Sequence, residues 1–258
     1  MRRWVLRGVG GQEDTAVGVE TQVHADEGRA IVHVSGRLDL TDTAPLRNRL
    51  LKCLADQPEA LLVNLARLTV REPLALAVFS AVARQAARWP AIPVALCAPE
   101  PHVRRSLSLA AYQRVPVYAS VQAAKDGLPD HRAALRALSD ELLPIAGAAR
   151  QARNRATEAC VLWDLPELVA PASLIASELV SNVIDHAGTM MTLRLTLRSR
   201  YLQIAVTDGS TAVPALQIVA PAQVSSGRGL MLVDATAHAW GWLPCNGGKV
   251  VWASLRTP

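Results

Sequence analysis

The chain has 258 residues, of which half are hydrophobic and 19% are charged, so it can bury a sizeable core and is not intrinsically disordered. Its formal net charge of +5 at pH 7 comes from scattered arginines without a dense basic block, which favours a solvated arginine-rich exterior over a nucleic-acid surface. An anionic nucleotide or an acidic protein partner suits this charge balance equally well. The length fits one large domain or two ordinary ones.

The cysteines and the N-terminus indicate a cytoplasmic location. The four cysteines are widely spaced and form no CxxC pair, which favours buried thiols in a reducing cytosol over zinc or disulfide sites. The basic N-terminus is followed by Gly and Gln instead of an apolar stretch, so we expect no signal peptide. No uncharged apolar run approaches membrane-spanning length. We therefore expect a soluble cytoplasmic protein.

The first half of the chain alternates between strand and helix patterns. Residues 1–20 are Gly-rich and aperiodic, which is typical of a flexible tail. The predicted buried strands are residues 30–34, 61–65 and 93–97. The predicted helices are residues 42–54, 74–87, 102–111 and 121–128. This alternation predicts a mixed α/β domain over residues 21–127, followed by a linker over residues 128–140 where Gly and Pro interrupt the pattern.

The pattern restarts in the second half, over residues 141–258. Helices are predicted at residues 150–162 and 173–187, and Gly188 is a candidate C-cap of the second. Residues 193–198 and 202–208 alternate apolar and polar side chains across a short turn, which indicates an antiparallel hairpin. A last strand is predicted at residues 249–255. This half is therefore expected to be an α+β domain.

Asp208 ends one of these strands and has the same parity as its apolar side chains, so the strand directs the carboxylate toward the buried side. A buried carboxylate needs a hydrogen-bond partner. The alternative is that the strand has ended and that Asp208 and Gly209 open a solvated turn, which is the commoner use of this dipeptide. Lys249 is expected to be a solvated lysine at a strand edge, with a phosphate contact as the alternative.

Two further segments carry polar groups that suit a nucleotide. Glu178 and Asn182 lie one turn apart on an otherwise apolar helix, where they either face solvent or present oxygens to a cation and its ligand. Asp185, one turn further on, is expected on an exposed face. Gly227, Arg228 and Gly229 precede an apolar helical run, and such a loop suits phosphates, although a lone GxG is weak on its own.

Taken in order, these segments resemble the nucleotide-binding boxes of GHKL (histidine-kinase-like) ATPases. Residues 178–187 look like the N-box, residues 206–210 like the first glycine box, and residues 227–233 like the second. The Gly-Lys-x-Val-Trp sequence at residues 248–252 is similar to the ending of RsbW-like anti-sigma-factor serine kinases. The resemblance covers about residues 142–256 and implies a Bergerat-type sandwich that binds ATP and Mg.

The resemblance also implies residue roles. Asn182 would coordinate Mg, and Glu178 would orient the attacking serine hydroxyl as the catalytic residue. Asp208, followed by Gly209, would accept a hydrogen bond from the adenine amino group. The residues that would wrap the phosphates are Gly227, Arg228, Gly229 and Leu230. The segment between the two glycine boxes, residues 210–226, would form the ATP lid.

The first half resembles a STAS domain, the fold of the anti-sigma-factor antagonists that these kinases phosphorylate. The similarity lies in residues 34–40, 62–69 and 117–124 and spans about residues 22–127. The family's acceptor serine follows an Asp, but this chain reads Arg-Glu-Pro-Leu at residues 71–74 and has no hydroxyl there. Thr69 and Ser80 lie nearby and are expected to be structural.

Two functions are weighed. The leading hypothesis is a partner-switching transcription regulator: an ATP-binding anti-sigma factor that phosphorylates a separate STAS-type antagonist as a serine kinase. The alternative is a non-catalytic ATP-binding regulator whose unphosphorylatable STAS half mimics an antagonist in cis. The expected partners are a sigma factor, a STAS-type antagonist and a second copy of the ATPase domain, without direct contact to nucleic acid or membrane.

Overall fold

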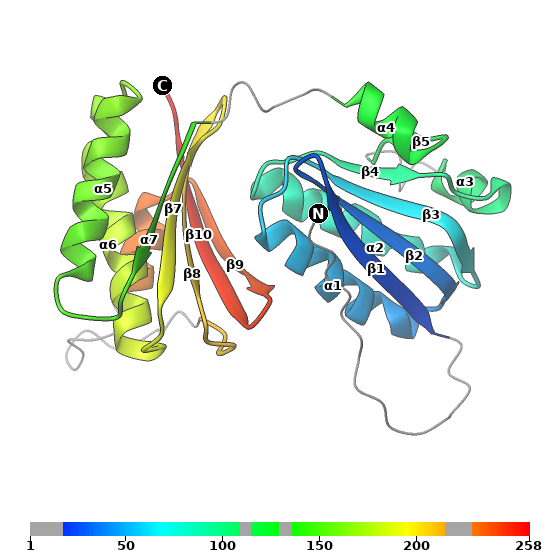
Figure 1. Cartoon of the computed structure of the whole chain (residues 1–258), viewed down its shortest axis with the longest axis horizontal. Coiled ribbons are helices and arrows are strands. Elements are labelled where there is room, and N and C mark those ends of the chain that lie inside the picture. Colours follow the sequence, from blue (N-terminus) through cyan, green and yellow to red (C-terminus); the bar gives the residue numbers. More distant parts are fainter. Residues whose placement is uncertain (1–17, 109–114, 129–135, 215–228) are drawn as a thin grey trace. The chain divides into compact units, whose positions relative to one another are not determined.

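The chain forms two compact units, Met1–Arg132 and Ala133–Pro258 (Figure 1). The structure is a computed structural model, and it describes residues 18–108, 115–128, 136–214 and 229–258. Each unit contains one five-stranded sheet with helices packed against it.

The sheet of the first unit has the strand order β1-β2-β3-β4-β5. Only the β1–β2 pair is antiparallel, and the three other pairs are parallel. The strands are β1 (Val19–Asp26), β2 (Arg29–Leu38), β3 (Leu61–Val70), β4 (Val94–Cys97) and β5 (Val117–Tyr118). The helices are α1 (Thr43–Ala55), α2 (Ala77–Arg88), α3 (Pro101–Leu107) and α4 (Val121–Gly127), with 3-10 turns η1 (Leu40–Asp42) and η2 (Pro73–Leu76). The predicted α/β fold is confirmed for this unit.

Strand β1 was not predicted, because it has no apolar signature. It pairs with β2 along the edge of the sheet, and none of its side chains is buried. The backbone ladder therefore holds a segment whose side chains carry no periodic signal. The expected tail over residues 1–20 ends earlier than predicted, since Val19 and Glu20 belong to β1, and residues 1–17 lie outside the described part of the chain.

The second unit has an antiparallel sheet of order β6-β7-β8-β10-β9. The strands are β6 (Arg136–Leu142), β7 (Met191–Leu197), β8 (Tyr201–Asp208), β9 (Ala239–Cys245) and β10 (Gly248–Arg256). The helices are α5 (Ala148–Leu162), α6 (Val169–His186) and α7 (Gly229–Thr236), with a 3-10 turn η4 (Pro166–Leu168). Gly188 follows α6 with a φ of +61°, as expected of its C-cap.

Both edge strands of this sheet were missed. The expected linker over residues 128–140 is too long, because its last five residues, Arg136–Asp140, pair with β7 as part of β6. Strand β9 contains Gly241 and Pro244, which interrupt a strand pattern in sequence. Pro244 is tolerated because β9 pairs only with β10 and its outer edge has no ladder to break.

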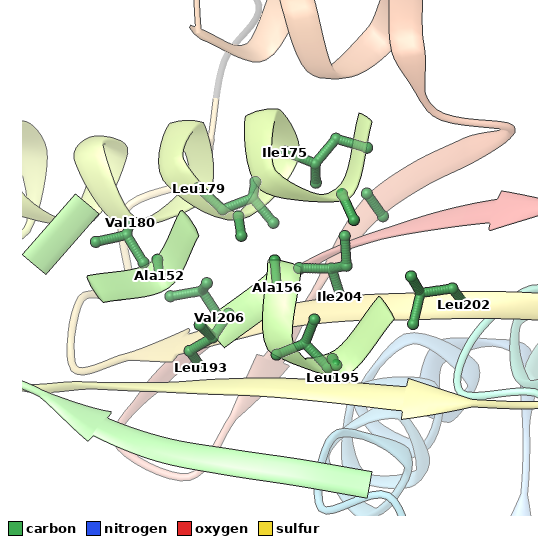
Figure 2. Close-up of a cluster of buried hydrophobic side chains, with 14 of the residues drawn as sticks. Ala152, Ala156, Ile175, Leu179, Val180, Leu193, Leu195, Leu202, Ile204 and Val206 are labelled. Carbon is green, nitrogen blue, oxygen red and sulfur yellow. The ribbon is translucent and has the colours of Figure 1, made fainter. Parts of the chain in front are cut away.

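The core of the second unit lies between the sheet and the helices α5 and α6 (Figure 2). Within the described ranges, one helical segment, Pro166–His186, is long and apolar enough to cross a membrane by length and composition alone, with a mean hydropathy of 1.3. Its residues Ile175, Leu179 and Val183 contribute to this core. The helix is therefore apolar because it is covered on one side by the sheet and on another by α5.

Helix α5 approaches α6 closely through a stripe of small side chains. Its buried alanines, fully or almost fully enclosed, are Ala148, Ala152, Ala156 and Ala159. They recur at a spacing of three or four residues, so they line one face of the helix. Side chains this small leave no room for added volume between the two helices.

We predict that Ala156→Leu overpacks this contact and lowers the free energy of unfolding of the second unit by about 1–3 kcal/mol. Hydrogen exchange of the α5 and α6 amides in the full chain measures the effect. The matched control is Ala170→Leu, at an exposed position of α6, which should change exchange little. Equal protection in the two variants would contradict the account of this core.

Candidate functional site

The predicted N-box side chains lie at the border between core and solvent. Glu178 and Asn182 are half-buried on α6, whereas Asp185 is exposed as expected. The flanking apolar residues of the same helix are buried, and α6 packs against β7, β8 and β10. The helix therefore holds a carboxylate and an amide one turn apart, beside the sheet but not within the core.

The start of α7 lies against these two side chains. A Cβ built on Gly229 would be 2.7 Å from Oε2 of Glu178 and 3.3 Å from Oδ1 of Asn182. Leu230, 8% exposed, and the fully enclosed Val233 anchor α7 in the core. We call Glu178, Asn182 and Gly229 the helix cluster. The contact brings the unpaired N–H groups at a helix N-terminus close to a carboxylate and an amide, where an anion or a metal-bound phosphate is favoured.

Asp208 is buried, with 4% of its surface exposed, and faces the helix side of the sheet together with the apolar residues of β8. Its partner directly across the β8–β10 ladder is Lys249. The Lys249 ammonium donates to Asp208 Oδ1 at 2.9 Å and to the Ser210 carbonyl at 3.3 Å. The Ser210 N–H donates to the same carboxylate oxygen at 2.7 Å. We call Asp208, Ser210 and Lys249 the strand-end cluster.

The expectation that Lys249 is a solvated edge lysine is wrong. Only 8% of its surface is exposed, because it shares the parity of Val251 and Ala253, which belong to the core. Its strand is also not at the edge of the sheet, since β9 lies outside it. The alternation of the last strand already placed Lys249 on the buried side. The sequence did not show that β9 covers this strand or that Asp208 is the partner of Lys249.

Two buried polar atoms of these clusters have no partner among the described residues. They are Oδ2 of Asp208 and Nδ2 of Asn182. A buried carboxylate oxygen without a donor costs free energy, so each such atom in a folded protein needs an explanation. A ligand that donates a hydrogen bond to Asp208 Oδ2 and accepts one from Asn182 Nδ2 is one explanation that answers both.

Glycines around these clusters allow close approach of the backbone. Gly248 precedes Lys249, and a Cβ on it would be 1.8 Å from the Asp208 carbonyl oxygen. Gly209 is exposed, and its N–H donates to Thr189 Oγ1 at 3.0 Å. Gly227 and Arg228, predicted for the phosphates, lie outside the described residues, as does most of the predicted lid.

No hydrogen bond or ion pair between described residues joins the helix cluster to the strand-end cluster. They are related through the contacts of α6 with β8 and β10.

A separate polar group lies between β6 and α5. Arg155 donates there to Asp140 at 2.7 Å and to Glu158 at 2.8 Å, and it lines an open hollow of about 480 Å³. The bond to Glu158, and then that to Asp140, raises the pKa of Arg155, so this group is an ion-paired clamp between strand and helix.

In the first unit, the segment at the expected acceptor position is exposed. Residues 71–74 are all exposed, and Leu74 has 65% of its surface in solvent. The two nearby hydroxyls have structural surroundings: Thr69 donates to the Gly36 carbonyl at 3.2 Å, and Ser80 is only 6% exposed. The exposed segment therefore presents an apolar side chain where a hydroxyl was sought.

Comparison with known proteins identifies this unit. Residues 20–124 match the STAS domain family. The first unit is a STAS domain. The expectation of a STAS-like fold is thereby confirmed for this part of the chain.

Several individual proteins are similar to parts of the chain. An uncharacterised protein of Streptomyces coelicolor is 47% identical over 70 residues, which are 25% of this chain and 66% of that protein. An anti-sigma factor antagonist from Mycobacterium paratuberculosis is 22% identical over 46% of this chain and its own full length, with a TM-score of 0.40. The RsbU and RsbW domains of a Mycobacterium tuberculosis protein are 17% identical over 47% of this chain and 32% of that structure, with a TM-score of 0.36.

We predict that Gly248→Ala destabilises the second unit by about 3 kcal/mol, because the new methyl group meets a backbone carbonyl that no rotamer change can move. Hydrogen exchange of the β8 and β10 amides is the measurement. Asn246→Ala, an exposed change in the same β9–β10 connection, is the control. A Gly248→Ala protein with unchanged β8–β10 protection would show that the approach of the two strands is not as described.

Proposed function

We propose that the chain is a partner-switching regulator whose second unit binds Mg-ATP and phosphorylates a serine on a separate STAS-type antagonist. The STAS domain supports a partner-switching regulatory role, because this is the fold of anti-sigma-factor antagonists. The ATP-binding half of the proposal is supported by the second unit. Its sequence has the three boxes in order, and its structure brings residues of two of them together at Gly229.

The single observation that carries the proposal is the contact of Gly229 with Glu178 and Asn182. Residues 47 or more positions apart in sequence are held together only because α7 begins on the face of α6 that carries these polar groups. The first residue of α7 has no side chain, so its backbone N–H groups stay open to a bound group.

The residues present fit Mg-ATP. The Asn182 amide oxygen is a hard ligand of the kind that Mg prefers, together with phosphate oxygens. The N-terminus of α7 suits the phosphates, and the unpaired Asp208 Oδ2 needs a donor of the kind that an adenine amino group provides. ATP would supply the phosphoryl group that is transferred.

Glu178 would orient the serine hydroxyl of the partner and accept its proton as the oxygen attacks phosphorus. Asn182 and the N-terminus of α7 would hold the metal and the phosphates. Catalysis would therefore rest mainly on positioning and on charge stabilisation. The same unit would bind the sigma factor in the switching cycle, and phosphorylation of the antagonist would decide which partner stays bound.

A second candidate function is an ATP-binding regulator without kinase activity. The observation that favours it is the exposed segment 71–74, which offers Leu74 and no hydroxyl. In this candidate, the STAS domain would act as an antagonist that cannot be switched by phosphorylation at this segment. The two candidates differ in one measurement: transfer of label from γ-labelled ATP to STAS proteins of the same organism.

We predict that Glu178→Gln lowers the rate of phosphoryl transfer about 100-fold or more, because the carboxylate that accepts the proton is lost. ATP affinity should change less than about threefold, since Glu178 is not expected to bind the nucleotide. Label transfer to the antagonist and calorimetry measure the two effects. Asp185→Asn, an exposed change on the same helix, is the control. Wild-type rates in Glu178→Gln would exclude the catalytic role, and binding without transfer in the wild type would favour the second candidate.

We predict that Asn182→Ala removes the Mg dependence of nucleotide binding. Without the amide oxygen, the metal loses its protein ligand, and ATP should bind about equally weakly with and without Mg. Titrations in the presence of Mg and of a chelator measure this difference. A variant that keeps the full wild-type gain from Mg would show that Asn182 does not hold the metal.

A further inference from the structure

The strand-end cluster contains hydrogen-bonding capacity that the described protein groups leave unused. An ammonium group has three N–H donors, and Lys249 uses two of them, on Asp208 Oδ1 and on the Ser210 carbonyl. Among the described residues, the third donor has no acceptor. Both protein donors to Asp208 converge on Oδ1, and Oδ2 is left without a partner. The cluster thus keeps one unused acceptor, on Asp208, and one unused donor, on Lys249.

The two unused groups are held in a fixed relation. Asp208 and Lys249 lie directly opposite each other on paired strands, and their side chains are 1% and 11% exposed. The Ser210 N–H and carbonyl lock both charged groups from the turn that follows β8. A carboxylate that receives two donors on one oxygen cannot rotate freely, so Oδ2 is directed away from them. The cluster is therefore preorganised before any ligand binds.

We propose that Lys249 is a base-recognition residue, which acts with Asp208 to read the Watson–Crick edge of adenine in the proposed nucleotide site. Asp208 Oδ2 accepts from the exocyclic amino group, and Lys249 donates to the neighbouring ring nitrogen N1. Adenine has this donor–acceptor order on its edge, and guanine and hypoxanthine have the reverse. This inference rests on the proposed function, since it names how that site selects its nucleotide.

The pairing explains why a lysine is placed at a buried position. A buried ion pair contributes little net stability, because the desolvation of both charges offsets their attraction. If the pair served stability alone, two apolar residues of similar volume in place of Asp208 and Lys249 would serve as well. In the proposed role the charge is needed, since a base in which N1 carries a hydrogen would place that hydrogen against an ammonium and its carbonyl oxygen against a carboxylate. Such mismatches at a buried polar site reject a ligand strongly.

The wild-type protein tests this inference through nucleotides altered at one atom. Calorimetry of the full chain with Mg compares ATP, 7-deaza-ATP, which keeps the Watson–Crick edge, and 1-deaza-ATP, which has a C–H in place of N1. We expect 7-deaza-ATP to bind within about threefold of ATP and 1-deaza-ATP to bind at least about tenfold more weakly. GTP and ITP should bind at least about 100-fold more weakly than ATP.

The variant Lys249→Met keeps the length of the side chain and removes its donors. It should bind ATP more weakly and lose the preference for ATP over 1-deaza-ATP, and Lys52→Met in the first unit is the matched control. Equal affinity of the wild-type chain for ATP and 1-deaza-ATP would overturn this inference and leave the proposed function standing. Failure of the wild-type chain to bind ATP at all would overturn both. An unchanged preference in folded Lys249→Met would show that Lys249 serves only the ion pair.

Discussion

The second unit is organised around a carboxylate that it buries without fully satisfying. Asp208 is almost inaccessible, yet all of its protein donors contact one oxygen, and the other has no partner within the described chain. The surrounding structure is arranged to permit this. Lys249 lies opposite it on β10, and Gly248 allows β10 to pass within contact of the Asp208 carbonyl. A chain that only needed to end a strand would place Asp208 in solvent, where its second oxygen would bind water at no cost.

The helix cluster also holds a polar side chain with an atom that is unpaired among the described residues, Nδ2 of Asn182. Glu178 and Asn182 interrupt an apolar helix, and α7 starts against them with a glycine. The two clusters lie on elements that pack together, α6 with β8 and β10, so they belong to one face of one unit. One end of the proposed nucleotide needs a polar edge that reads its base, and the other needs a metal ligand and helix N–H groups. The strand-end cluster offers the first and the helix cluster the second.

Some of this was predictable from sequence because it depends only on the local periodicity of a strand or a helix. The burial of Asp208 follows from its place in an alternating strand, and the helical spacing of Glu178 and Asn182 follows from their positions. The burial of Lys249 opposite Asp208 was missed, since it depends on which strand lies beside β8 and on β9 covering the outer edge. Strands β1 and β6 were missed because edge strands are held by backbone pairing and show little apolar pattern. The contact of Gly229 with α6 depends on how α7 is anchored by Leu230 and Val233, which is a property of tertiary packing.

In the proposed function, one nucleotide contacts the end of β8, α6 and the start of α7 at the same time. Hydrogen exchange of the full chain, with and without Mg-ATP, tests this most directly, because it reports where the ligand acts. The account predicts added protection in residues 178–189, 207–214 and 229–233, and unchanged exchange in residues 61–76 of the STAS domain. Exchange that is unaltered by Mg-ATP in all three segments would contradict it.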